Sequence, residues 1–133
     1  MLEARLRKAR RLLDLHRDLQ RLEEERIAGL RRRQDELAVL QEEIFNSLNG
    51  DEGLQGLFTP MIVRRLKSLG DESLRVAEEL KRRSEALLAI SARTKHAERL
   101  AHTYEQGHNR ASAERELRDI IERIARPEDA SLP

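Results

Sequence analysis

Residues 62–104 read IVRRLKSLGDESLRVAEELKRRSEALLAISARTKHAERLAHTY. One row of mostly apolar or small residues runs through this stretch in alternating steps of four and three. A seven-residue repeat of this kind holds one side of an α-helix against a second helix. The repeat keeps its phase across Gly70, which favours one continuous helix over about 60–125. The row comprises Ile62, Leu66, Leu69, Ser73, Val76, Leu80, Arg83, Leu87, Ile90, Thr94, Ala97, Ala101 and Tyr104.

The first part of the chain predicts the partner helix, over about residues 2–48. Its apolar residues step by threes and fours, or by seven from Leu30 to Leu37, with one irregularity where the row passes through Arg26. Such an irregularity is a stutter, which locally unwinds a left-handed supercoil. The predicted row comprises Leu2, Leu6, Ala9, Leu12, Leu15, Leu19, Leu22, Leu30, Leu37, Leu40, Ile44 and Leu48.

A turn is predicted between the two helices, over about residues 49–58. Asparagine and glycine gather there, and both residue types favour helix ends and turns. Thr59 can cap a helix and Pro60 suits its first position, so the second helix is expected to begin at about Pro60.

Folding at this turn gives an all-α protein, a long two-helix antiparallel coiled-coil hairpin that forms a single domain over residues 1–133. In this register Leu48 lies near Pro60, and Leu2 lies near Gln106. Basic and acidic blocks alternate along the chain, and the fold sets each basic block beside an acidic one. Complementary charge beside a seam fixes the orientation of helices in coiled coils.

The second helix is longer than the first, so we expect a C-terminal helical overhang before a short tail at 127–133. Gly107 marks the point at which the first helix runs out. An apolar stripe without a partner in the chain is a binding site, a dimer interface or a fraying end. The stripe comprises Ala113, Leu117, Ile120, Ile121 and Ile124.

The composition argues against enzyme activity and against metal or cofactor binding. Charged residues make up 38% of the chain and aromatic residues 2%, a balance typical of long helices rather than of a compact core with a pocket. The chain has no Cys, and no pair of its four His has the spacing of a helical metal site. We therefore expect no enzyme activity, no catalytic residue, no metal and no cofactor. No apolar run suits a membrane span, and a cytoplasmic location is expected.

Two arginine clusters, Arg5 to Arg11 and Arg31 to Arg33, suggest binding to nucleic acid or anionic lipid. Acidic residues three or four positions away favour a solvated helix face instead. The apolar residues at the turn end allow either a cap on the seam or a partner-binding tip. These residues are Leu48, Leu54, Leu57, Phe58 and Met61.

The C-terminal sequence resembles a known family. The segments AERL at 97–100 and ELRDIIERIA at 116–125 are similar to its pattern of a charged helix leading into a Leu-Asp-Glu-like segment and a closing Ala-Arg. The adjacent Asp-Glu pair of that pattern is missing here. The Asn49-Gly50-Asp51 segment resembles the polar mid-chain loop of the family. On these residues the chain resembles the FliJ family of the bacterial flagellar export apparatus and its YscO-like type III secretion relatives.

The resemblance implies a non-enzymatic stalk or adaptor that is cytoplasmic and peripheral to the inner-membrane export apparatus. The termini would enter the hexameric export ATPase ring, and the loop half would reach the export gate or chaperones. The implied ATPase-facing residues are Leu117, Arg118, Ile120, Ile121, Arg123 and Ile124. The implied gate-facing residues are Ile44, Phe45, Leu48, Phe58 and Ile62. The alternative is a homo-oligomerising coiled-coil scaffold, in which the C-terminal apolar stripe pairs with the same stripe of a second copy.

Overall fold

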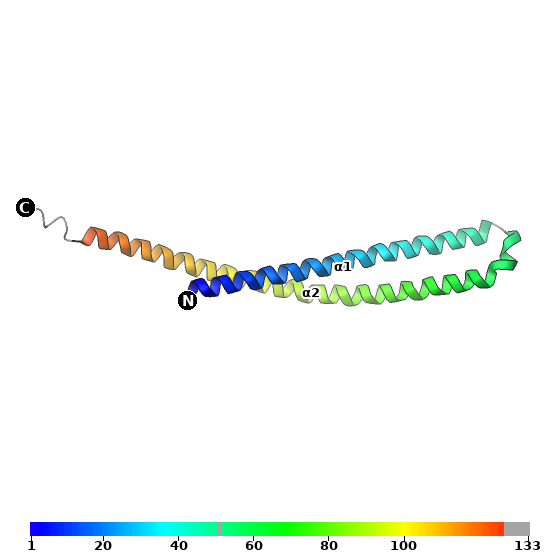
Figure 1. Cartoon of the computed structure of the whole chain (residues 1–133), viewed down its shortest axis with the longest axis horizontal. Helices are drawn as coiled ribbons and strands as arrows, with labels where there is room; N and C mark the ends of the chain where they lie inside the picture. Colours follow the sequence, from blue (N-terminus) through cyan, green and yellow to red (C-terminus); the bar gives the residue numbers. More distant parts are fainter. Residues whose placement is uncertain (51, 127–133) are drawn as a thin grey trace, which may run out of the picture. The chain divides into compact units, whose positions relative to one another are not determined.

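The computed structural model describes residues 1–50 and 52–126, with the side chains of 1–49 and 59–126. Helix α1 spans Leu2–Gly50 and helix α2 spans Glu52–Ala125 (Figure 1). The described residues include no strand, and the two helices pack against each other. The predicted all-α two-helix hairpin is confirmed.

The packing divides into two compact units, each built from one segment of α1 and one of α2. Unit 1 comprises Met1–Arg17 with Ala92–Pro133, and unit 2 comprises Asp18–Ser91. The core of unit 1 is made largely of small side chains. It consists of Ala9, Leu13, Ala97 and Ala101, with Tyr104 packed against them.

Larger side chains form the core of unit 2. Leu37 and Leu69 are completely or almost completely buried, at 0% and 1% exposed, and Val76 joins them. Packed around these three are Leu30, Leu40, Ile44 and Leu80. Branched aliphatic side chains at alternating steps interdigitate well along a helix seam, so this core holds the two segments of the unit together.

The predicted row of α2 is confirmed at every position. Each of its residues, from Ile62 to Tyr104, is buried or half-buried. The helix also runs without a break through Gly70 and Gly107. A glycine costs only about 1 kcal/mol relative to alanine inside a helix, which the surrounding packing offsets.

The predicted row of α1 is wrong between Leu12 and Leu22, whereas Leu6, Ala9 and its positions from Leu30 to Leu48 are buried or half-buried as predicted. Leu12, Leu15, Leu19 and Leu22 are all exposed, by 41% to 56%. The positions that face α2 are instead Leu13, His16, Gln20, Glu23 and Ile27, each buried or half-buried. These positions continue the three-four alternation from Leu6 and Ala9, so the predicted stutter through Arg26 is absent and Arg26 is exposed.

The physical reason for the difference lies in the opposite helix. The seam of α2 opposite this part of α1 includes the polar residues Arg83 and Thr94, and Arg83 gives a carboxylate on α1 a partner that a leucine could not use. Glu23 pairs with Arg83 in unit 2. In unit 1 the Thr94 hydroxyl donates to the His16 carbonyl oxygen at 3.4 Å.

The start of the second helix also differs from the prediction. The backbone is helical from Glu52, so Pro60 lies inside α2 and not at its first position. Pro60 is the ninth residue of α2, beyond the first turn, and because proline lacks an N–H one helix hydrogen bond is not made there.

Contacts within each unit follow the predicted antiparallel register to within a few residues. In unit 1, Leu2 Cδ2 would lie 3.8 Å from a Cβ atom added to Gly107, one residue from the expected Gln106. In unit 2, the Arg33 guanidinium lies 2.8 Å from a carboxylate oxygen of Glu72.

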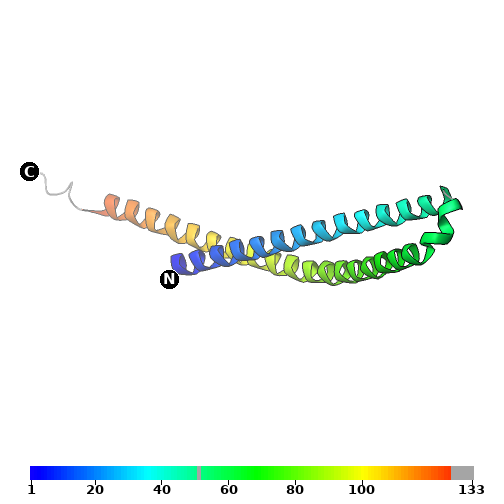
Figure 2. The same ribbon diagram turned by 45° about the vertical axis from the view of Figure 1, so that its right-hand side comes forward.

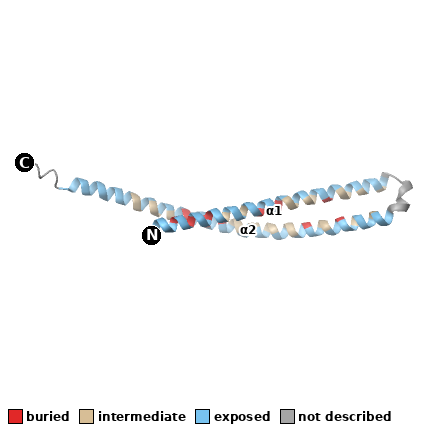
Figure 3. Ribbon diagram, in the orientation of Figure 1, coloured by how far each residue is buried: buried red, intermediate tan, exposed pale blue. Residues whose placement is uncertain are grey.

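The overhang of α2 is present in unit 1. Every residue from Ala113 to Arg126 is exposed. Figures 1 and 2 show no other helix beside this part of α2, drawn in orange, and Figure 3 shows it in the colour of exposed residues. The predicted tail at 127–133 lies outside the described residues.

Candidate functional site

Four large apolar side chains of the overhang are exposed. Leu117, Ile120, Ile121 and Ile124 are spaced by three or four residues or adjacent, which places them on one face of α2. We call these four residues the overhang stripe. Burying each against a partner would contribute about 2 kcal/mol, so a partner for this face is favoured. Arg118 and Arg123 are exposed beside the stripe.

The residues predicted at the turn end divide into three groups. Ile44, Leu48 and Ile62 are half-buried, and Ile44 packs on the core of unit 2. Phe45 is exposed, as are two other apolar side chains of unit 2, Met61 and Val63. The side chains of Leu54, Leu57 and Phe58 lie outside the described residues, and so does any hydrophobic contact of the predicted tip that they make.

A second apolar surface, in unit 1, was not predicted. It is a groove of about 370 Å³ between α1 and α2. Of the α1 side chains that line it, Leu12 is exposed, as is neighbouring Leu15, whereas Ala9 is buried and His16 is half-buried. The groove is lined by Ala9, Leu12, His16, Ala92, Arg93, His96, Ala97 and Leu100.

The sequence does contain a signal for this surface. Leucines at 12, 15, 19 and 22 are spaced like a seam, and so are the positions 13, 16, 20 and 23 beside them. Two adjacent rows at seam spacing indicate a helix with two contact faces. The prediction took the leucine-rich row for the only one and placed it in the hairpin seam.

A polar network crosses the seam of unit 2. The buried carboxylate of Glu23 accepts from the Arg83 guanidinium at 3.2 and 3.3 Å, and it lies 3.7 Å from that of Arg26. Arg83 also donates to Glu79 at 2.9 Å. This bond lowers the pKa of Glu79, and the hydrogen bonds to Glu79 and Glu23 raise the pKa of Arg83. The network fixes which turns of the two helices face each other.

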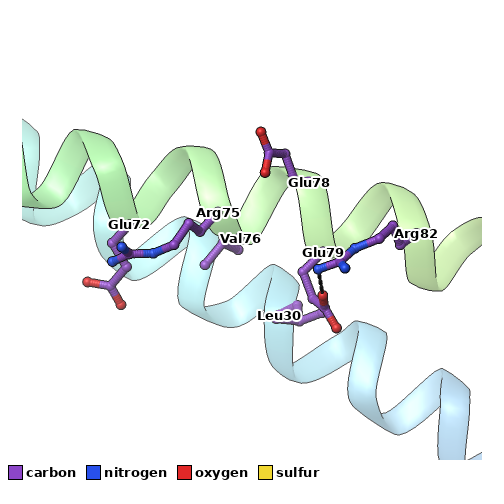
Figure 4. A pocket seen from close by; sticks show the side chains of 7 residues that line it. All are labelled: Leu30, Glu72, Arg75, Val76, Glu78, Glu79 and Arg82. Atoms are coloured by element: carbon purple, nitrogen blue, oxygen red, sulfur yellow. Dashed lines mark hydrogen bonds and ion pairs between the residues drawn. The ribbon is translucent and has the colours of Figure 1, made fainter.

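A shallow hollow of about 650 Å³ lies beside this network, and Figure 4 shows its lining. Leu30 comes from α1 and the other lining residues come from α2. Glu79 is paired with Arg82 and Arg83, and Glu72 is paired with Arg33. Glu78 points away from α1 (Figure 4). Paired charges on an open surface resemble a solvated helix flank, not a site that excludes water around a cofactor.

Metal-binding groups do not gather in the described part of the chain, where no three His, Cys, Asp or Glu side chains are suitably placed. His16 and His96 both line the groove of unit 1. Two imidazoles without a third ligand fall short of a zinc site.

The arginine clusters are partly neutralised within their units. Arg10 lies 3.4 Å from Glu105, and Arg33 pairs with Glu72 and Glu36. Arg31 and Arg32 are exposed. Ion pairs with neighbouring acids reduce the positive field that would attract a phosphate backbone.

Comparisons with models of known protein families, with curated proteins and with solved structures gave no match. Neither helix, over its described residues, has a stretch long and apolar enough to cross a membrane. A function for this chain therefore has to be argued from its exposed apolar faces.

Proposed function

We propose that the chain is a non-enzymatic stalk or adaptor of a bacterial flagellar or type III protein export apparatus. In this proposal the overhang stripe binds the export ATPase ring, with Arg118 and Arg123 at its flanks. The protein works in the cytoplasm, at the periphery of the inner-membrane export apparatus, and promotes assembly of the ring or its coupling to transport.

The exposed overhang stripe is the observation that carries this proposal. It stands on a helix that continues past the end of α1 in unit 1, so its apolar face is open to a protein from outside the chain. A helix with one apolar face suits a hydrophobic groove of a partner protein, because that face can be buried there while the charged residues stay in water. The resemblance of residues 97–125 to the FliJ family gives that partner its identity in the proposal.

The proposal includes a second contact, in unit 2, with the export gate or with chaperones. Phe45 supports it, because its ring is exposed next to the half-buried Ile44. Met61 and Val63 add exposed apolar surface to the same unit. Exposed aromatic and methionine side chains are enriched at the centres of protein interfaces.

The test is the hydrolysis rate of the flagellar or type III export ATPase of the same organism, with and without the chain. We expect stimulation by the full chain. We expect none from a truncation that ends at Gln106, or from Leu117→Asp combined with Ile121→Asp, because a charge within the stripe prevents its burial. Leu88→Asp is the matched control, since Leu88 is 73% exposed and lies in unit 2.

Stimulation that survives the truncation would remove the overhang stripe from the proposal. If the full chain neither stimulates the ATPase nor co-elutes with it at micromolar concentration, the stalk assignment fails for that ATPase. A loss of stimulation in the Leu88→Asp control would show that added charge, and not the stripe, is responsible.

A further inference from the structure

Unit 1 presents two apolar surfaces that its own residues leave uncovered. The first is the overhang stripe, and the second is the groove, whose exposed lining includes Leu12 and Leu100. The overhang cannot fold back into the groove of its own chain, because α2 is one uninterrupted helix from Ala92 to Ala125. Among the described residues nothing covers either surface, so both are open to a second molecule.

The two surfaces share one face of α2. His96, Leu117 and Ile124 are separated by multiples of seven residues, and so are Leu100 and Ile121. Positions seven apart lie on the same side of a helix within a coiled coil. The same face of two copies can therefore meet, provided that the two α2 helices run antiparallel and cross near Gly107.

In such an antiparallel arrangement, the groove of each copy receives the overhang of the other. Leu100 then lies opposite Leu117 of the second copy, and His96 lies opposite Ile121. The contact is isologous, since each copy gives its overhang and receives one. A contact of this kind closes at two subunits.

The charges on helix α1 independently support this antiparallel arrangement of the incoming overhang. It is antiparallel to α2 within unit 1, so an overhang that enters the groove antiparallel to α2 runs parallel to α1. The residues Lys8, Arg11 and Leu12 have the same order and spacing as Glu116, Asp119 and Ile120. All six side chains are exposed. Lys8 and Arg11 thus face two acids, and Leu12 faces an isoleucine.

We propose that the chain forms a reciprocal antiparallel dimer, in which the overhang of each copy lies in the groove of the other between α1 and α2. The occupant of the groove is thus a second copy of this chain, selected by apolar surface and by complementary charge. This inference is independent of the proposed function. The dimer covers the overhang stripe, so dimerisation and binding of the export ATPase exclude each other.

The test is a charge-swap experiment monitored by sedimentation equilibrium. One variant carries Lys8→Glu and Arg11→Glu, and the other carries Glu116→Lys and Asp119→Lys. Each variant alone sets like charges against each other at both contacts, and we expect its dissociation constant to rise at least about tenfold. Mixing the two variants restores opposite charges at both contacts, so an equimolar mixture is expected to form the dimer.

A matched control carries Arg31→Glu and Arg32→Glu, the same change of charge on exposed residues of unit 2. It should dimerise like the unchanged chain, and circular dichroism should show equal helix content in all variants. A monomeric unchanged chain at micromolar concentration would overturn the proposal. So would a mixture of the two variants that stays monomeric.

Dimerisation that persists in Lys8→Glu/Arg11→Glu but is lost in Leu117→Asp/Ile121→Asp would mean that the overhangs pair with each other, which also overturns the proposal. The proposed function is tested separately by the Lys8→Glu/Arg11→Glu chain. That variant keeps its overhang stripe and should still stimulate the export ATPase.

Discussion

Glu23 occupies a seam position that the prediction assigned to a leucine row, and its partners explain why a carboxylate is stable there. Its side chain is buried, and Arg83 and Arg26 lie beside it. The sequence predicted Arg83 correctly as a seam residue of α2. It could not single out Glu23, because the choice depends on which turn of α1 faces Arg83, and that is fixed only by the packed pair.

Replacing Arg83 should lower the melting temperature more than replacing Glu23. Arg83→Leu leaves the buried carboxylate of Glu23 without its main partner, so we expect the melting temperature to fall by roughly 5 °C or more. Glu23→Leu leaves Arg83, whose long side chain can extend to water, and the fall should be smaller. Thermal unfolding followed by circular dichroism measures both. Equal falls would contradict the predicted difference between the two residues, and no fall in either variant would mean that the pair does not stabilise the seam.

The ionised carboxylate of Glu79 should stabilise the folded hairpin, and this stabilisation should be lost in acid. The hydrogen bond from Arg83, and then the charges of Arg82 and Arg83, hold the pKa of Glu79 below its ordinary value in the folded chain. A lowered folded pKa stabilises the fold above the ordinary carboxyl pKa, and this stabilisation is lost as the pH falls through the folded value.

Glu79→Gln removes this contribution and so reports it. The melting temperature of the variant should lie below that of the unchanged chain at neutral pH, and the difference should shrink as the pH falls from about 5 to about 3. Comparing the two chains at each pH cancels the titration of the other carboxylates. A difference that stays constant over this range would contradict the role given to Glu79.

At the scale of helices, sequence periodicity predicted α2 better than α1. The α2 row has one seven-residue repeat with no competing row, and each of its positions is buried or half-buried. Helix α1 has two rows at seam spacing, and hydrophobicity alone selects the leucines. In the correct row Glu23 pairs with Arg83 of α2, and apolar periodicity alone cannot predict such a polar pair.

The ends of the helices were predicted less well than their middles. Gly53, Gly56 and Pro60 suggested a longer turn, yet the backbone is helical from Glu52. Each glycine lowers helix propensity by only about 1 kcal/mol, so a helix that is packed further along its length can extend through them.

Leu37 and Leu69 should be the most sensitive positions of the seam. They are the largest fully buried side chains among the described residues, and both belong to the core of unit 2. We expect Leu37→Ala or Leu69→Ala to lower the free energy of unfolding by about 3 kcal/mol, through lost apolar burial and the cavity left behind.

Leu88→Ala serves as the control in the same unit, because Leu88 is 73% exposed. Its effect on urea unfolding should stay within about 0.5 kcal/mol. If Leu88→Ala proved as costly as Leu37→Ala, the seam would have to run along a different face of α2.

For the whole molecule, the two-helix fold was predictable from the sequence. The exposed apolar surfaces were predictable only in part. The overhang was predictable, because α2 is longer than α1 and its stripe has no counterpart. The groove of unit 1 was not, since it arises where Ala92 and Ala97 of α2 leave room beside Leu12 of α1. Two uncovered apolar surfaces in one unit favour a protein that works through association with other chains.

The central claim is that the overhang stripe is the surface that meets the export ATPase, and cysteine labelling tests it most directly. The chain has no Cys, so Leu117→Cys, Ile121→Cys and Leu88→Cys each introduce a single thiol. Labelling rates would be measured with and without saturating ATPase, at chain concentrations below those of self-association. We predict that the ATPase slows labelling several-fold at positions 117 and 121 and leaves position 88 unchanged. Unchanged rates at 117 and 121 with the ATPase bound would contradict the claim.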